Sequence, residues 1–294
     1  RRRRGGDQVS FQMPQNLDEL AAALREKDKN TYLCAGGTDL VIHLRKDKNF
    51  HYSLIDLTHL PELSKITETE DHVLIGAGVT MTELEQSPVI RKWMPALAKA
   101  ASMVGSTQIR NRATLGGNVA NASQSSDTTP VLLAYGAEAE ILDESGAETI
   151  RLVDDFVEGL EKTSLGEREV ILKFLVRKQN VLSGFAKVGT RKAVTISKIN
   201  GCICAEIKEG CMAHPVVYLG AVGAKASRAR LIEACLEGLS LSGCDEEKVR
   251  DAVYAQIEEN IPDRPSKHYK KSAAFGVVDQ ILDDLRRAEE EAGR

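Results

Sequence analysis

RATLGGNVANASQSSD, residues 112–127, combines two adjacent glycines with small hydroxyl and amide side chains and one carboxylate, Asp127. Few of these side chains suit a hydrophobic core. Glycine lets a backbone pass close to a bound group because no side chain intervenes. Successive backbone N–H groups in such a segment can form a concave site for an anion such as phosphate. The stretch therefore indicates a binding site for a phosphate-bearing ligand.

A second glycine-rich stretch, LCAGGTDL at Leu33–Leu40, has the same character. It follows a short apolar run and precedes a helical pattern at 40–46, whose N-terminus would favour a phosphate. A single Gly-Gly turn is more often a tight connection without a ligand. Two such turns on one chain suggest that they bind one diphosphate-bearing cofactor from opposite sides.

Length and composition are those of a soluble globular protein. The chain has 294 residues, of which 42% are hydrophobic and 28% charged, so two domains are expected. The net charge of −4 gives no general attraction to nucleic acid or to an anionic membrane. The sequence shows no apolar run long enough for a membrane span and no signal peptide. We therefore expect a cytoplasmic protein.

The opening Arg1–Arg4 with Gly5-Gly6 is unlike the rest of the chain. One interpretation is a tether to nucleic acid or a membrane. The other, which we prefer, is that residues 1–7 are disordered or a remnant outside the fold.

Six cysteines occur without a secretory signal, so disulfides are not expected. Cys202-x-Cys204 with Cys211 invites an iron–sulfur interpretation, but the spacing does not match the common cluster motifs. Cys202 and Cys204 would share one face of a strand, as core residues do. We predict free thiols and no metal site.

The chain shows no motif for a nucleophile, an acid–base pair or a metal-bound water. A Gly-x-Ser-x-Gly elbow and a His-Glu-x-x-His pattern are both missing, and the histidines follow no shared face. No catalytic residue is therefore predicted. A cofactor cradle without such residues suggests that the cofactor supplies the chemistry and the protein supplies binding and tuning.

The hydrophobic pattern predicts an α+β fold in three parts. A strand at 9–12, a helix from the N-cap Asn16 to Asn30, a strand at 32–35, a helix at 40–46 and a strand at 52–56 predict a small parallel sheet. The second part is mainly antiparallel, with hairpins at 65–77 and 138–152, a strand at 169–176 and helices at 80–87, 90–102 and 131–135. The last third predicts an antiparallel sheet (185–187, 202–208, 216–222) backed by helices at 228–237, 245–255 and 266–290.

Four motifs in one order resemble a known family. They are AGGTDL (35–40), GSTQIRN (105–111), TLGGN (114–118) with Asp127 nine residues after Asn118, and FAKVGTRKAVTIS (185–197). Together they resemble the FAD-binding subunit of the molybdenum hydroxylases, which include xanthine, nicotinate and carbon monoxide dehydrogenases. The resemblance runs from about Phe11 to Leu285.

The resemblance implies a division of the chain. A two-part FAD-binding domain of the PCMH/VAO-like type would occupy 8–178, with a parallel α/β subdomain at about 8–57 and a mainly antiparallel subdomain at 58–178. A C-terminal domain would occupy 179–290, as an antiparallel sheet with helices.

The resemblance also assigns cofactor-binding positions. The FAD diphosphate would be held, mainly by backbone N–H groups, at Leu33, Cys34, Ala35, Gly36, Gly37, Thr38, Asp39 and Leu40, and at Thr114, Leu115, Gly116, Gly117 and Asn118. Asp127 would bind the adenosine ribose, since a carboxylate accepts two bonds from paired hydroxyls. Gly105 would lie where the chain passes the adenine. Ile171 is the remaining residue that we expect to contact the cofactor. Lys187 would lie near the flavin and raise its potential, whereas without the resemblance it is a solvent-facing strand lysine.

The implied function is that of an electron-transfer flavoprotein subunit in a hetero-oligomer. An iron–sulfur small subunit with [2Fe–2S] clusters would supply electrons, and a molybdopterin large subunit would carry out hydroxylation in an enzyme like xanthine or nicotinate dehydrogenase. This chain would pass electrons from FAD to NAD⁺ or another acceptor. The substrate meets a different subunit, so this sequence does not name it.

Two alternatives remain. A stand-alone flavin oxidoreductase of the same fold would need a dedicated acid or base near the flavin, and no residue declares itself. An interaction protein that kept the fold and lost FAD is opposed by the two intact glycine stretches.

Overall fold

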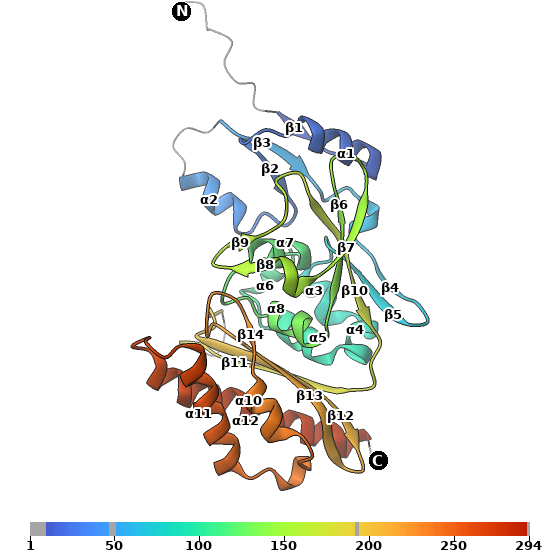
Figure 1. Ribbon diagram of the computed structural model, residues 1–294. Coiled ribbons are helices and arrows are strands. Elements are labelled where there is room, and N and C mark those ends of the chain that lie inside the picture. The colour runs from blue at the N-terminus through green and yellow to red at the C-terminus, as the bar shows by residue number, and fades with distance from the viewer. Residues whose placement is uncertain (1–9, 47–50, 192–193, 293–294) are drawn as a thin grey trace, which may run out of the picture.

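Three sheets of three, five and four strands follow one another along the molecule in chain order (Figure 1). The computed structural model describes residues 10–46, 51–191 and 194–292. The prediction for residues 1–7 lies outside these ranges. The mixture of parallel and antiparallel sheets confirms the α+β fold class. The division into domains at about 57 and 178 stays a prediction.

The first sheet is parallel, in the order β1-β3-β2, as the β-α-β-α-β pattern predicts. Its elements are β1 (Phe11–Gln12), α1 (Leu17–Glu26), β2 (Thr31–Cys34), α2 (Leu40–Lys46) and β3 (Ser53–Asp56).

Helix α1 begins as predicted and ends earlier than predicted. The Asn16 side chain accepts a hydrogen bond from the Glu19 N–H and so caps the first turn. The expected end at Asn30 is wrong, because Lys27 already leaves the helical conformation with ψ of 126°. The Asp28 carboxylate then accepts from the Asn30 N–H and closes a turn that a helix cannot include.

The second sheet is antiparallel, in the order β4-β5-β10-β6-β7. Its strands are β4 (Ile66–Glu68), β5 (His72–Gly76), β6 (Glu138–Leu142), β7 (Glu148–Leu152) and β10 (Val170–Arg177), and a separate hairpin pairs β8 (Val157–Gly159) with β9 (Lys162–Thr163). The helical elements are η1 (Pro61–Leu63), α3 (Met81–Gln86), α4 (Pro88–Trp93), α5 (Pro95–Ser102), α6 (Thr107–Arg110), α7 (Leu115–Asn121), α8 (Thr129–Ala134) and α9 (Val153–Phe156).

The single helix predicted at 90–102 is wrong, because α4 and α5 are separate helices. Met94 between them has φ of −140°, outside the helical region. Pro95 follows directly and has no N–H to continue the hydrogen-bond ladder.

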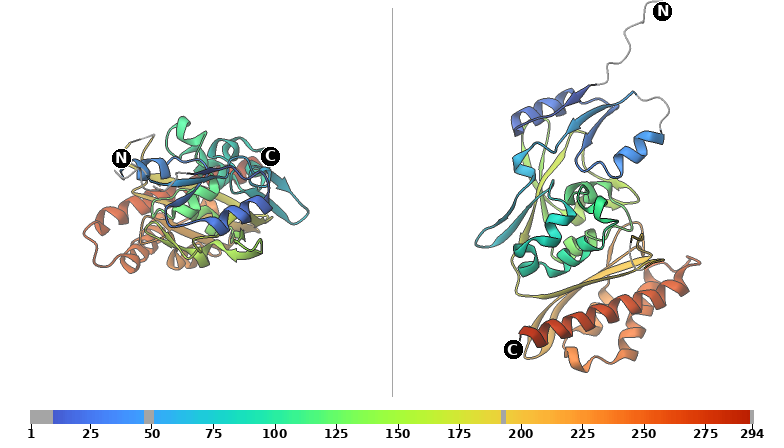
Figure 2. Two further views of the ribbon diagram at one scale, coloured as in Figure 1. Left: turned by 90° about the horizontal axis from the view of Figure 1, so that it is seen from above. Right: turned by 180° about the vertical axis from the view of Figure 1, so that it is seen from behind.

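The third sheet is antiparallel, in the order β11-β12-β13-β14, with helices on its outer face. Its elements are β11 (Leu182–Val188), β12 (Ile199–Lys208), β13 (Cys211–Gly220), β14 (Ser227–Arg228), α10 (Arg230–Leu236), η2 (Leu241–Gly243), α11 (Glu246–Asn260) and α12 (Lys267–Ala292). Figure 2 shows α12 running along the sheet on the side away from the rest of the molecule.

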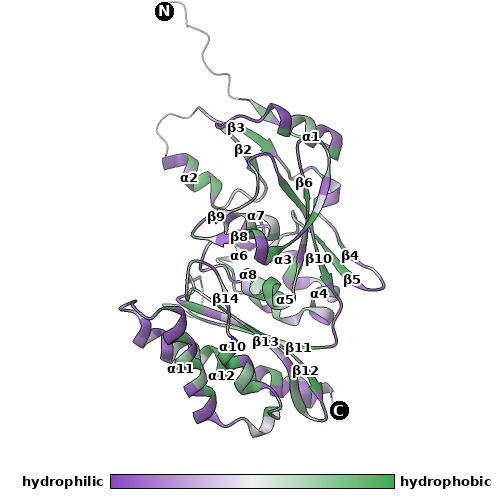
Figure 3. Cartoon of the chain, viewed as in Figure 1, coloured by the Kyte–Doolittle hydropathy of each residue, from purple (hydrophilic) through white to green (hydrophobic). Residues whose placement is uncertain are grey.

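Both faces of the third sheet are buried in apolar cores. Phe185, Cys202 and Cys204 join the core that continues through the first two sheets, while Ile203 and Val217 point into a second core beneath α10, α11 and α12. Cys202 and Cys204 thus share one face of β12, as predicted, with their Sγ atoms 3.9 Å apart. Figure 3 shows apolar residues concentrated on the strands of the second and third sheets. Within the described ranges, no helix has the length and apolar character that crossing a membrane requires.

Candidate functional site

The first glycine stretch leaves a row of backbone donors that have no partner in the part of the chain that the structure describes. After β2 the chain turns through Ala35–Asp39 before α2 begins at Leu40. None of the N–H groups of Ala35–Asp39 donates to an acceptor among the described residues. Gly37 adopts φ of +70°, a left-handed conformation that glycine takes without steric cost. Consecutive unpaired N–H groups of this kind can bind an anion.

The second glycine stretch is the first turn of helix α7 rather than a connecting turn. Its backbone donors are already used: the Leu115 N–H donates to Val79 O (2.9 Å) and the Gly116 N–H to Ala77 O (2.8 Å). Thr114 is the N-cap, and its Oγ1 accepts from the Gly117 N–H at 3.1 Å. The expectation that these N–H groups are available to a ligand is therefore wrong.

The second stretch instead offers a ligand a surface of small residues and one side-chain amide. Gly117 and Ala120 are exposed on the same side of α7. Asn118 Oδ1 accepts hydrogen bonds from the hydroxyls of Ser126 (2.6 Å) and Thr128 (2.7 Å). These two bonds orient the Asn118 NH₂ group away from the protein hydroxyls, so it can donate to a ligand.

Two of the glycines are required by packing of the protein on itself. A Cβ at Gly36 would lie 2.0 Å from Arg112 O, so the two glycine stretches meet backbone to backbone at this point. A Cβ at Gly116 would lie 2.6 Å from the Ala77 Cβ. At Gly117 the nearest atom is Thr114 Oγ1, at 2.8 Å, and this glycine faces outward.

A cavity of about 120 Å³ opens between the two stretches. Ala35 from the first stretch, Gly117 and Ala120 from α7, and Leu165 and Ile171 from the facing wall contribute to its lining. Leu33 and Gly116, two further predicted residues, line it as well. A pocket for a whole cofactor has a volume of several hundred Å³, so this cavity takes only part of such a ligand. Its small, apolar walls lie next to the row of unpaired N–H groups.

Glu169, the carboxylate in this cavity, lies outside every motif of the sequence. Arg151 Nη2 donates to Glu169 Oε1 at 2.5 Å, and the Gly166 N–H donates to Oε2 at 2.7 Å. The bond from Arg151 is the main reason that the pKa of Glu169 is lowered. A carboxylate that is paired and ionised in this way is a poor general base, so the cavity offers a binding surface rather than an acid–base pair.

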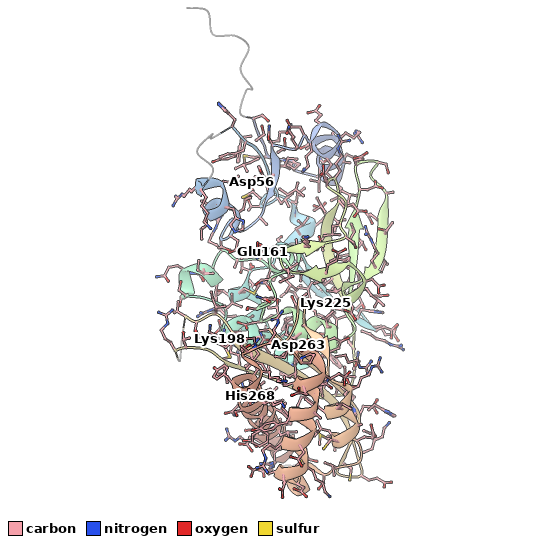
Figure 4. All side chains as sticks on the ribbon, turned by 60° about the vertical axis from the view of Figure 1, so that its left-hand side comes forward. Asp56, Glu161, Lys198, Lys225, Asp263 and His268 are labelled. Carbon is pink, nitrogen blue, oxygen red and sulfur yellow. The ribbon has the colours of Figure 1, made fainter. Side chains whose placement is uncertain are left out.

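Cys34 in the first stretch is a half-buried thiol. Burial raises its pKa, and the nearby Asp56 carboxylate, labelled in Figure 4 at the end of β3, raises it further. A thiol with a raised pKa stays protonated and is a weak nucleophile.

Asp127 and Lys187, predicted separately, form a buried ion pair. Lys187 Nζ lies 2.5 Å from Asp127 Oδ2 and also donates to Met103 O at 2.7 Å. The two side chains are 7% and 5% exposed, respectively. The alternative that Lys187 is a solvent-facing strand lysine is therefore wrong.

Two further residues complete this cluster, and neither was predicted. Ser197 Oγ and Asn200 Nδ2 donate to Asp127 Oδ1 at 2.6 and 2.8 Å. Ser197 is the last residue of the motif at 185–197, and this motif is the one feature of the sequence that could have identified it. Asn200 lies outside every motif, so only the structure identifies it.

Gly105 lies in the connection between α5 and α6, two residues after Met103. Its φ of +47° is left-handed. The Met103 carbonyl accepts from Lys187, so this connection lies alongside the Asp127–Lys187 pair. The predicted residues thus fall into two groups: one around the cavity and one around the ion pair, joined by α7 and the loop after it.

Comparison with known proteins agrees with these features. The chain matches the family model described as the FAD binding domain in molybdopterin dehydrogenase over residues 7–176. It is 30% identical over 281 residues to the nicotinate dehydrogenase FAD-subunit of Eubacterium barkeri, covering 94% of this chain and 95% of that protein. It is also 30% identical over 256 residues to the xanthine dehydrogenase FAD-binding subunit of Escherichia coli O157:H7, covering 86% of this chain and 87% of that protein.

A similar structure is that of carbon monoxide dehydrogenase from Hydrogenophaga pseudoflava, in a form that lacks the Mo-pyranopterin moiety. The TM-score is 0.83 with 26% sequence identity, over 94% of this chain and 96% of the other. The similarity therefore extends through the C-terminal sheet and helices, beyond the residues that the family model matches.

Proposed function

Because this chain belongs to the family of FAD-binding subunits of molybdenum hydroxylases, we propose that it is the electron-transfer subunit of such an oxidoreductase. The observation that carries the proposal is the row of unpaired N–H groups at Ala35–Asp39 beside the cavity of about 120 Å³. This arrangement suits a diphosphate next to a flat, apolar group. When bound, FAD supplies the capacity to accept electrons from one donor and pass them to another.

Several of the predicted residues have a role in this proposal. The N–H groups of Ala35–Asp39 would bind the diphosphate, with the Asn118 amide as a further donor. Gly117 and Ala120 on one side, and Ile171 on the other, would enclose part of the cofactor. Asp127 would accept from the adenosine ribose. We place Lys187 at the same end of the cofactor, because it is bonded to Asp127, and this placement replaces the expectation that Lys187 lies near the flavin.

The names of the relatives support a multi-subunit assembly. Nicotinate dehydrogenase and xanthine dehydrogenase each contribute a relative described as a FAD subunit. We propose that this chain joins an iron–sulfur small subunit and a molybdopterin large subunit. It would take electrons from [2Fe–2S] clusters and deliver them to NAD⁺ or another acceptor. A cytoplasmic location is part of the same proposal, supported by the free cysteines of the described chain.

The first test is the absorbance spectrum of the purified full chain, with the released cofactor identified by mass. We expect FAD at about one molecule per chain. FMN, or no flavin after incubation with excess FAD, would contradict the proposed cofactor. The second test is co-purification from a native source: iron- and molybdenum-containing chains are expected with it, whereas a flavin-loaded chain that purifies alone and oxidises a substrate would favour a stand-alone enzyme.

The acceptor is tested on the assembled complex. Anaerobic reduction followed by addition of NAD⁺ should re-oxidise the flavin and yield NADH. If only an artificial dye re-oxidises the flavin, NAD⁺ is not the acceptor.

A further inference from the structure

The Asp127 carboxylate belongs to one half of the molecule and is held by the other. It lies in the loop that follows α7, the helix whose Gly117 and Ala120 line the cavity. Within the described part of the chain, its side-chain donors all come from the C-terminal part: Lys187 on β11, Ser197 in the following loop and Asn200 on β12. Asn200 also donates to Ser126 O at 3.0 Å, so its one NH₂ group binds two successive residues of the loop.

The orientation of the Asn200 amide follows from its neighbours. Both acceptors near its NH₂ group are oxygens, a carbonyl and a carboxylate. A reversed amide would place its own oxygen against them, so the hydrogen-bond network fixes the orientation. The side chain is fully buried, and its Oδ1 has no donor among the described residues.

The Oδ1 of Asn200, without a donor in the described chain, lowers the free energy of unfolding. A buried oxygen without a donor destabilises the folded state, whereas an apolar side chain of similar volume would avoid that loss. The neighbouring strand makes room for the oxygen: a Cβ at Gly220 would lie 2.0 Å from Asn200 Oδ1. Both amide hydrogens of Asn200 are directed at the Ser126–Asp127 segment. Because packing alone would favour an apolar side chain at this position, the function of Asn200 is to hold that segment in place.

The donors also determine which oxygen of Asp127 is left for a ligand. A carboxylate oxygen has two lone-pair sites. Ser197 and Asn200 together occupy those of Oδ1, while Lys187 alone occupies one of Oδ2. Among the residues that the structure describes, no other donor reaches Oδ2, so one acceptor site on it remains.

We infer that Asn200 is a positioning residue for adenosine recognition. With Ser197 it fixes the Asp127 carboxylate so that the remaining site on Oδ2 accepts a ribose hydroxyl, and the C-terminal sheet thereby sets the affinity for the adenosine half of FAD. This inference rests on the proposed function, since it requires that the chain binds FAD.

The test compares the affinity of the full chain for the adenosine half and for the flavin half of the cofactor. FAD, ADP and FMN are titrated into the apo protein by calorimetry, for the wild type and for Asn200→Ala. We expect the Kd for FAD and for ADP to rise by about tenfold, because one bond to a charged acceptor is lost. The Kd for FMN should stay unchanged, because FMN has no adenosine.

A matched control is Gln256→Ala. Gln256 is also a buried amide of the C-terminal part, 2% exposed, and its Oε1 accepts from the Leu231 N–H at 2.9 Å. Its removal should lower the melting temperature without changing the ratio of FMN to ADP affinity. A second test variant, Ser197→Ala, removes the other donor to Oδ1 with little change in volume, and should raise the Kd for ADP by about threefold.

Each outcome decides the inference. A parallel loss of FMN and ADP affinity in Asn200→Ala would show a merely structural role, and unchanged ADP affinity in both test variants would overturn the inference while FAD binding stands. If Asn200→Ala does not fold, the result for Ser197→Ala decides. A wild-type chain that binds no FAD would overturn the proposed function as well.

Discussion

Gly36 and Gly117 are both part of Gly-Gly pairs, and they are glycines for different reasons. Gly36 lies against the backbone of Arg112, which leaves no room for a side chain. Gly117 is exposed and lines the cavity. Substitution at the first position should therefore affect folding, and at the second position ligand binding.

Gly36→Ala is expected to lower the free energy of unfolding by about 3 kcal/mol, because the new Cβ would overlap the Arg112 carbonyl oxygen. Urea denaturation of the apo protein measures this. The control is Gly276→Ala on α12, where nothing lies within 4 Å of the added Cβ. Alanine there should stabilise the helix by about 0.5–1 kcal/mol. Equal stability of Gly36→Ala and wild type would refute the close backbone contact.

Gly117→Val should abolish FAD binding, with a loss of more than about a hundredfold in affinity, and leave the C-terminal sheet folded. The valine side chain would project into the cavity that we assign to the cofactor. Flavin fluorescence titration measures binding, and circular dichroism checks the fold. Gly276→Val is the control with the same added volume on an exposed helix position. Retained FAD in Gly117→Val would place the cofactor elsewhere.

At this scale the sequence revealed the glycines, Asp127 and Lys187 but not what surrounds them. Asn200 is 73 residues from Asp127, and an asparagine at such a distance carries no local signal. The used N–H groups of Leu115 and Gly116 depend on carbonyls that follow β5, so no motif could show that they are occupied. Pairing of this kind exists only once the sheet has formed.

Among the elements, α2 stands apart from the sheet whose strands it connects (Figure 1). Val41 and Ile42 on it are 40% and 53% exposed. Its bounds, Leu40–Lys46, agree with those predicted, because they follow from local periodicity. The break between α4 and α5 was missed, since the apolar spacing continues across Met94 and only the conformation at Pro95 ends the first helix.

The contact between α11 and α12 should depend on pH. Hydrogen bonds from Lys267 and Lys271 lower the pKa of Glu258 from 4.5 to about 2. A carboxyl whose pKa is lower in the folded state stabilises the fold above its unfolded pKa and loses this effect as pH falls through the folded pKa. The stabilisation should therefore be complete above about pH 5 and decline steadily toward about pH 2.

Glu258→Gln removes the charge with little change in shape. The difference between the urea midpoints of wild type and variant should be largest at about pH 7, be clearly smaller at about pH 3 and vanish only below about pH 2. A difference that stays constant over this range would mean that the glutamate acts through packing rather than charge. Because Glu258 is exposed, added salt should reduce the difference at neutral pH.

Over the whole molecule, the third sheet joins two cores. Strand β12 alternates between them, with Cys202 and Cys204 facing one and Ile203 and Ala205 the other. Polar contacts support the junction: Tyr135 Oη donates to Ser183 Oγ at 2.6 Å, from α8's end to β11. Apolar packing and this hydrogen bond therefore join the parts of the chain that lie on either side of residue 178.

Differential scanning calorimetry of the apo chain should show one unfolding transition, because loss of the third sheet exposes both cores at once. FAD should raise its midpoint, since a ligand that binds only the folded state stabilises it. Two well-separated transitions, with FAD shifting only one, would show that the C-terminal part unfolds independently and would also weaken the role given to Asn200.

Both apolar faces of the third sheet have a consequence for synthesis on the ribosome. The segments that form α5 and α8 leave the exit tunnel before β11, β12 and β13, which cover them, have been translated. During that interval the nascent chain exposes an apolar surface. The Asp127 carboxylate also lacks its hydrogen-bond donors, because Lys187, Ser197 and Asn200 have not yet been translated. The chain is therefore most prone to aggregation between completion of the second sheet and release from the ribosome, and the Asp127 cluster forms only after β12 has been translated.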